Sequence, residues 1–181
     1  MEEEANDQRV VVLGVGNVLM RDDALGPYVV HLLEARYVFP PSVEVIDGGT
    51  PGLDFLPYLD GARAVIVVDT VSSEGEAGTL RLYRRKEFLA RPMPPRVTPH
   101  QPGIREAMMA AELMDSAPEE FVLIGVIPED MELGTRLTSP VQDAVEPAIE
   151  AVVQELLRLG VPPKRRRVPL EDGPWWQEEI P

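Results

Sequence analysis

The chain contains no cysteine, and only two of its 181 residues are histidine. Without cysteine the protein has no disulfide, no thiolate nucleophile and no cysteine metal ligand. Metal ligands would therefore come from carboxylates and from His31 and His100. No apolar run approaches the roughly 20 residues that span a membrane. The acidic start MEEEANDQ is unlike a secretory signal. We therefore expect a cytoplasmic protein that does not bind membranes.

Positive charge is also scarce, because 17 lysines and arginines face 31 aspartates and glutamates, for a net charge of −14. Such an excess of negative charge repels nucleic-acid phosphates and anionic membrane surfaces, so we expect neither as a partner. The remaining composition, 44% hydrophobic and 27% charged residues, is that of a globular domain with a sizeable core.

Strand-like and helix-like patterns alternate along most of the chain. The expected strands are 9–15, 42–46, 64–68, 79–83 and 120–127, and the expected helices are 25–37, 51–59, 104–114 and 140–159. Continuously apolar runs such as 64–68 are typical of parallel strands that are buried on both faces. The alternation predicts an α/β fold, a three-layer α/β/α sandwich around a mostly parallel twisted sheet of about five strands.

Residues 9–160 are expected to form one domain between two tails. Residues 1–8 are predicted to be a flexible, solvated tail. Residues 161–181 break the alternating pattern with the basic sequence PPKRRRVP and an acidic stretch that contains Trp175 and Trp176. The simplest interpretation of this C-terminal tail is disorder. The alternative is a segment that docks on the acidic or aromatic surface of a partner.

Residues 9–26, RVVVLGVGNVLMRDDALG, combine a strand, a glycine turn and the start of a helix. That order is typical of dinucleotide-binding proteins, but Leu19 replaces the third glycine of the G-x-G-x-x-G motif. Asp22 and Asp23 would also bring negative charge to the place where a pyrophosphate binds. The loop is therefore predicted to hold a cation or to act as a general acid or base, and we expect no nucleotide cofactor.

In open α/β sheets, functional side chains gather beyond the carboxyl ends of the strands. Asp23, Asp47 and Asp69 follow predicted strands, and His100 lies in the loop before a predicted helix. Two carboxylates and an imidazole are suited to a divalent ion such as nickel or zinc. The alternative is structural, with Asp23 capping a helix, Asp69 capping a turn and His100 simply exposed. His31, inside the first helix, is expected to be structural.

The chain has no G-x-S-x-G nucleophile elbow, and none of its serines has an evident base beside it. A hydrolase built on this chain would instead use water that is activated by a carboxylate or by a metal ion. The residues alone do not decide between this chemistry and the structural alternative.

Five segments, in order, resemble the hydrogenase maturation endopeptidases, the nickel-dependent proteases that process [NiFe] hydrogenases. They are GVGNVLMRDDALG (14–26), DGGTPG (47–52), VVDT (67–70), TPHQ (98–101) and GVIPEDMELGTRLTSPV (125–141). The first is the most specific, and the others add weight by their order and spacing. The resemblance implies one reaction, removal of the C-terminal extension of the hydrogenase large-subunit precursor after nickel insertion.

The resemblance also implies residue roles. The metal-contacting residues of the family match Asp23, Asp69 and His100, and Asp47 matches a further acidic position that is associated with activity or substrate engagement. The nickel is implied to be carried by the substrate, and another divalent ion is expected to substitute in vitro. We expect Asp23, Asp47 or Asp69 to activate water. Ala24 departs from a frequent glycine, which would cost about 1 kcal/mol if its φ were positive and nothing if it were helical.

Three other functions are alternatives to this one. The main alternative is a chaperone of the same fold that binds nickel or the precursor without cleaving it. A catalytically silent paralogue that serves another metalloenzyme is the next. A nucleotide-binding oxidoreductase is disfavoured by Leu19 and by the paired aspartates.

Overall fold

A five-stranded sheet with the strand order β3-β1-β4-β6-β5 forms the centre of the protein. The computed structural model describes residues 9–50, 55–90, 101–170 and 173–177. The sheet contains β1 (Val10–Val15), β3 (Val43–Gly49), β4 (Ala64–Thr70), β5 (Leu80–Arg84) and β6 (Glu120–Val126). All neighbours are parallel except β5, which pairs antiparallel with β6 at one edge. The prediction of a mostly parallel sheet of about five strands is confirmed.

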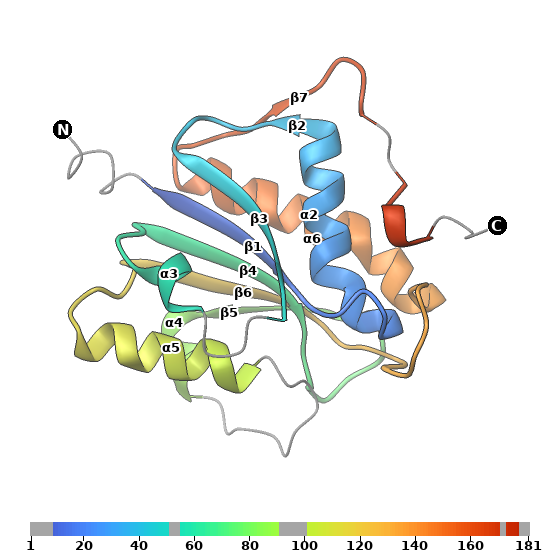
Figure 1. Ribbon diagram of the computed structural model, residues 1–181, viewed down its shortest axis with the longest axis horizontal. Coiled ribbons are helices and arrows are strands. Elements are labelled where there is room, and N and C mark those ends of the chain that lie inside the picture. The colour runs from blue at the N-terminus through green and yellow to red at the C-terminus, as the bar shows by residue number, and fades with distance from the viewer. Residues whose placement is uncertain (1–8, 51–54, 91–100, 171–172, 178–181) are drawn as a thin grey trace.

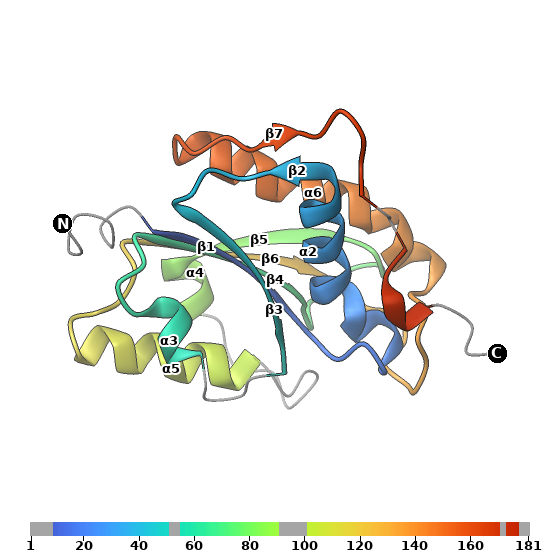
Figure 2. The ribbon, with the colours of Figure 1, turned by 45° about the horizontal axis from the view of Figure 1, so that its top comes forward.

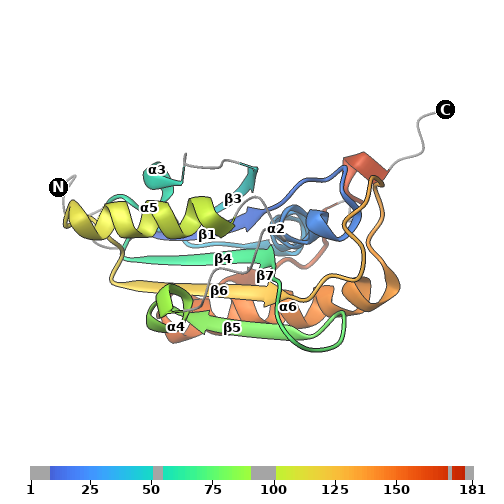
Figure 3. The same cartoon turned by 90° about the horizontal axis from the view of Figure 1, so that it is seen from below.

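Helices cover both faces of this sheet and complete the predicted three layers (Figure 1, Figure 3). One face carries α2 (Leu25–Arg36) and α6 (Ser139–Arg158), and the other carries α3 (Leu56–Leu59), α4 (Arg85–Ala90) and α5 (Gln101–Leu113). Side chains alternate along a strand, so Val10 and Val12 pack toward α2 and α6. Val11 and Leu13 belong to the opposite core, beside α3 and α5. Burial on both faces explains why β1 is continuously apolar.

The register of the sheet brings candidate site residues to one edge. Gly14 of β1 pairs with Asp47 of β3, and Asp69 lies one residue beyond the partner of Gly14 in β4. Helix α2 starts directly against this edge, because a Cβ atom at Gly26 would lie only 2.2 Å from the carbonyl oxygen of Val15. Glycine allows this close approach, which places the loop before α2 over the carboxyl ends of the strands.

The C-terminal segment folds back along α2 (Figure 2). Strand β7 (Lys164–Arg165) pairs antiparallel with β2 (Tyr37–Val38). The short helix η2 (Trp175–Gln177) follows, and its Trp176 side chain is 8% exposed. The Trp176 ring packs edge-on against Tyr28 and His31 of α2, at ring-centroid distances of 6.4 and 6.1 Å. The interpretation of residues 161–181 as a disordered tail is therefore wrong for the part that the structure describes, residues 161–170 and 173–177. His31 has a packing role, as expected.

Helix α4 lies in a stretch that is outside all the helices expected from the sequence. Its Phe88 is buried against Phe121 of β6, with ring centroids 5.0 Å apart. The backbone N–H of Arg84 donates to Glu87 Oε2 at 2.9 Å and closes the first turn. Residues 1–8 and the predicted helix start at residue 51 lie outside the described residues. Among the described helices, none is long and apolar enough to cross a membrane.

Candidate functional site

Asp23 lies in the loop between β1 and α2, within the short helix η1 (Arg21–Ala24). The loop turns at Gly16, whose φ is +146° and where a Cβ atom would lie 1.7 Å from the carbonyl oxygen of Asp23. The backbone N–H of Asn17 donates to Asp23 Oδ2 at 2.9 Å, and the Thr70 hydroxyl donates to Oδ1 at 3.4 Å. With 2% of its surface exposed, Asp23 is held between two strand ends.

The structural alternative for Asp23 was that it caps the first helix. The N-cap of α2 is instead Ala24, and no side chain makes a cap hydrogen bond there. That interpretation of Asp23 is therefore wrong. The φ of Ala24 is −73°, a right-handed helical value, so alanine at this position carries no conformational penalty.

Asp69 is the second-to-last residue of β4 and is fully buried. Its Oδ1 accepts a hydrogen bond of 2.7 Å from the backbone N–H of Thr70. Its Oδ2 is buried and has no hydrogen-bond partner within the described part of the chain. Burial raises the pKa of Asp69 well above its usual range, and the nearby charge of Asp23 raises it further, against a smaller lowering by the Thr70 N–H. A cation bound at Asp69 would offset both the burial and the negative charge of Asp23 that raise this pKa.

Asp47 lies at the same edge of the sheet but in a different environment. Its side chain is exposed, and its Oδ1 accepts a hydrogen bond of 2.9 Å from the backbone N–H of Gly49. Gly49 has a φ of +53°, which suits glycine and turns the chain away from β3. Asp47 is on β3 and Asp69 is on β4, with β1 between these two strands. The carboxyl ends of the strands therefore carry one exposed carboxylate, Asp47, and the buried carboxylates of Asp23 and Asp69.

His100 lies outside the described residues, directly before α5. Where the chain is described, no group of three or more histidines, aspartates and glutamates could hold a metal ion. A complete metal site would thus need a ligand beyond Asp23 and Asp69, and the assignment of His100 to that place stays a prediction.

Asp22 has a structural role that the sequence did not predict. It is fully buried and accepts four hydrogen bonds, from the backbone N–H groups of Glu129, Asp130 and Thr138 and from the Thr138 hydroxyl, at 2.7 to 2.9 Å. These donors lie 107 to 116 residues further along the chain, so no local pattern reveals them. Asp22 thereby fixes the loop of residues 127–138 to η1.

Further contacts join the same two loops, which run side by side at one end of the molecule (Figure 1, Figure 3). Met20 and Gly134 form an isolated parallel bridge. The Arg21 N–H donates to the Gly134 carbonyl at 2.8 Å, and the Gly134 N–H donates to the Leu19 carbonyl at 2.9 Å. Arg21 also pairs with Asp130 at 2.8 Å. The loop that carries Asp23 is therefore held in place by backbone hydrogen bonds and an ion pair to the loop of residues 127–138.

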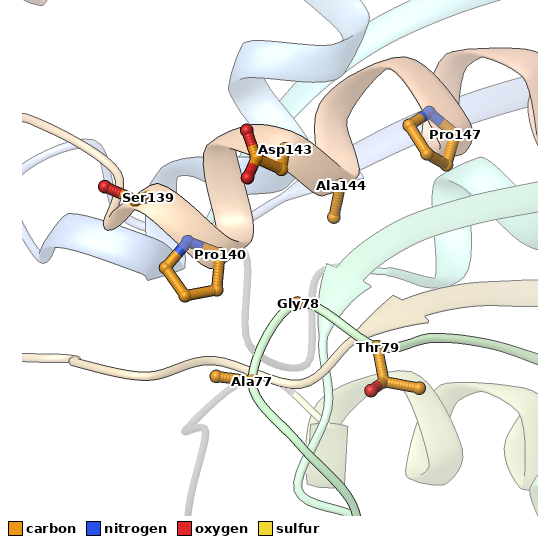
Figure 4. Close-up of a pocket in the computed structure, with 8 residues that line it drawn as sticks. All are labelled: Ala77, Gly78, Thr79, Ser139, Pro140, Asp143, Ala144 and Pro147. Carbon is orange, nitrogen blue, oxygen red and sulfur yellow. The ribbon is translucent and has the colours of Figure 1, made fainter.

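A separate groove of about 470 Å³ lies between the turn at 77–79 and the first turns of α6 (Figure 4). The turn approaches the helix closely because Gly78 has a φ of +80°, and a Cβ atom there would lie 2.3 Å from the Pro140 carbonyl oxygen. Asp143 supplies the only charged side chain among the residues that line it. Asp23, Asp47 and Asp69 do not line this groove, so it is distinct from the carboxylate site.

The mostly parallel sheet with helices on both faces defines an α/β protein. Its buried carboxylates lie at the carboxyl ends of the strands, where α/β proteins carry their functional sites. Residues 27–155 match the model of the hydrogenase maturation protease family, and the chain belongs to that family. The resemblance found in the sequence is confirmed, and with it the assignment of the chain to a class of proteases.

Relatives and solved structures agree with this family. The chain is 38% identical over 174 residues to the hydrogenase expression/formation protein HupD of Bradyrhizobium diazoefficiens, covering 96% of this chain and 91% of that protein. It is 38% identical over 154 residues to the hydrogenase 2 maturation protease of Escherichia coli, covering 84% and 93%. The structure is similar to the hydrogenase maturating endopeptidase HybD from E. coli, with a TM-score of 0.81, 36% identity and coverage of 87% and 98%.

Proposed function

We propose that this protease removes the C-terminal extension of a [NiFe] hydrogenase large-subunit precursor, and that it does so once nickel has been inserted. The observation that carries the proposal is the buried pair of Asp23 and Asp69, in which Asp69 Oδ2 has no partner within the described residues. A buried carboxylate oxygen without a hydrogen bond is costly unless a ligand completes it.

The nickel ion belongs to the substrate in this proposal. Without a cation, the negative charge of Asp23 and burial both disfavour the charged form of Asp69 and raise its pKa. A divalent ion presented by the precursor would offset the charges of both carboxylates. His100 is proposed as a third ligand, because imidazole and carboxylates suit nickel. Precursor without nickel would leave the two buried carboxylates without a cation, which supports discrimination between loaded and unloaded substrate.

The group that activates water is proposed to be Asp47. Asp69 is fully buried and is proposed to bind the cation, so it is poorly placed to accept a proton from an attacking water. Asp47 lies at the same sheet edge, has an exposed carboxylate and is oriented by the Gly49 N–H. A carboxylate that is both oriented and accessible to water suits general-base catalysis of peptide hydrolysis.

The test is the intact mass of nickel-loaded and metal-free large-subunit precursor after incubation with the protein. The wild type and the control Asp143→Asn, which changes an exposed carboxylate on α6, should shorten the nickel-loaded precursor only. Asp23→Asn and Asp69→Asn should leave it intact. Cleavage of metal-free precursor would refute the nickel requirement. Binding without cleavage by the wild type would favour the chaperone, and neither binding nor cleavage would favour the silent paralogue.

A further inference from the structure

Two large apolar side chains are exposed beside the carboxylate site, one on the loop that carries Asp23 and one on the loop of residues 127–138. Leu19 is 55% exposed and Leu133 is 79% exposed. Each directly precedes one partner of the parallel bridge between Met20 and Gly134. The Gly134 N–H donates to the Leu19 carbonyl at 2.9 Å, so the two leucines lie on directly neighbouring segments, and we call this exposed pair the leucine rim.

The leucine rim is held in place by backbone hydrogen bonds. The Leu19 carbonyl accepts from the Gly134 N–H at 2.9 Å, and the Leu19 N–H donates to Asn17 Oδ1 at 3.0 Å. The buried carboxylate of Asp22 anchors the loop on either side of Leu133, through Asp130 and Thr138. An apolar surface on an ordered backbone binds with little loss of conformational entropy, which is how preorganised interfaces gain affinity.

The leucine rim is also tied directly to the candidate site. Asn17 accepts from the Leu19 N–H with its side chain and donates with its own backbone N–H to Asp23 Oδ2 at 2.9 Å. A single residue thus connects the rim to the buried carboxylate. A protein surface that covers the rim would be positioned to present an adjacent segment to Asp23 and Asp69.

We propose that the leucine rim is the docking surface for the substrate protein, and that it binds an apolar surface of the large-subunit precursor next to the segment that is cut. This inference rests on the proposed function. The ion pair beside the rim, Arg21 with Asp130, joins the two loops to each other, and the exposed leucines themselves offer apolar surface to a partner. A second copy of the chain is a poor occupant, because two chains of net charge −14 repel each other.

The experiment compares the double variant Leu19→Ser/Leu133→Ser with the wild type and with Leu113→Ser. Leu113 is 90% exposed at the last residue of α5 and provides a matched loss of exposed leucine away from the rim. Initial cleavage rates are measured by intact mass over a range of nickel-loaded precursor concentrations. We expect the KM of the double variant to rise by about 100-fold, which is about tenfold for each rim leucine, with kcat unchanged. Leu113→Ser should match the wild type.

Binding of the same precursor to immobilised protein separates the two proposals. If the wild type cleaves and the rim variant matches Leu113→Ser in KM, the docking proposal is overturned and the proposed function stands. If the wild type binds without cleaving and the rim variant binds more weakly, the docking proposal stands and the proposed function fails. A wild type that neither binds nor cleaves overturns both. Light scattering that shows a wild-type dimer and a monomeric rim variant would make the rim a self-interface and overturn docking.

Discussion

Replacement of Asp22 by alanine should lower the free energy of unfolding by about 4 kcal/mol. The substitution removes the acceptor of four hydrogen bonds and leaves the N–H groups of Glu129, Asp130 and Thr138 and the Thr138 hydroxyl without it. A buried donor that loses its partner costs about 1 kcal/mol or more, so four of them reach about 4 kcal/mol. Asp22→Asn keeps one acceptor oxygen but turns an NH₂ group toward donors, and we expect about half that loss.

The assay is urea unfolding followed by far-UV circular dichroism, with hydrogen exchange of the backbone amides as a local measurement. Asp143→Ala, an exposed aspartate on α6, serves as the control and should change stability by less than about 0.5 kcal/mol. Exchange should accelerate at Glu129, Asp130 and Thr138 before it does in β1. A loss below about 1 kcal/mol for Asp22→Ala, with unchanged protection of these amides, would refute the idea that Asp22 holds the loop.

Three further predictions concern buried groups. The pKa of Asp69 is raised on folding, so the free protein should lose stability as pH rises from the ordinary aspartate pKa toward the folded one, and Asp69→Asn should remove this slope in pH-dependent thermal unfolding. The pKa of Glu155 is lowered, because Arg84 and Arg158 together outweigh its burial, which alone would raise it. Stability from this carboxylate should be lost as pH falls through its folded pKa, and Glu155→Gln should weaken that acid loss. Trp176→Ala should cost about 3 kcal/mol in urea unfolding, whereas Val168→Ala, at a 79% exposed position, should change little; equal effects would contradict docking of Trp176 on α2.

The sequence predicted those parts of the fold whose signal is local. The apolar runs at 64–68 and 120–127 became the central strands β4 and β6, because burial on both faces requires continuous apolar residues. Gly160 ends α6 with a φ of +78°, as expected for a residue after the helix C-terminus. Helix α4 and strand β7 were missed because they depend on contacts with β6 and β2, which lie far away in the sequence.

Residues of the candidate site were likewise predicted only where their signal in the sequence is local. The position of aspartates after predicted strands led to Asp23 and Asp69, and the structure brings both to one buried edge. Asp47 reaches the same edge as an exposed carboxylate. The role of Asp22 was not predictable, because its donors come from residues 129–138. Adjacent acids in the sequence therefore have separate tasks, one structural and one at the candidate site.

The buried, incompletely bonded carboxylate of Asp69 also affects how this protein can evolve. A chain selected only for resistance to heat would gain by replacing Asp69 with a neutral or apolar residue, because that removes a desolvated charge from the core. Directed evolution for thermostability should therefore enrich substitutions at this position, and under the proposed role of Asp69 the resulting robust proteins would no longer process the precursor. A selection that couples survival to hydrogenase activity should keep the aspartate and find its stabilising changes elsewhere.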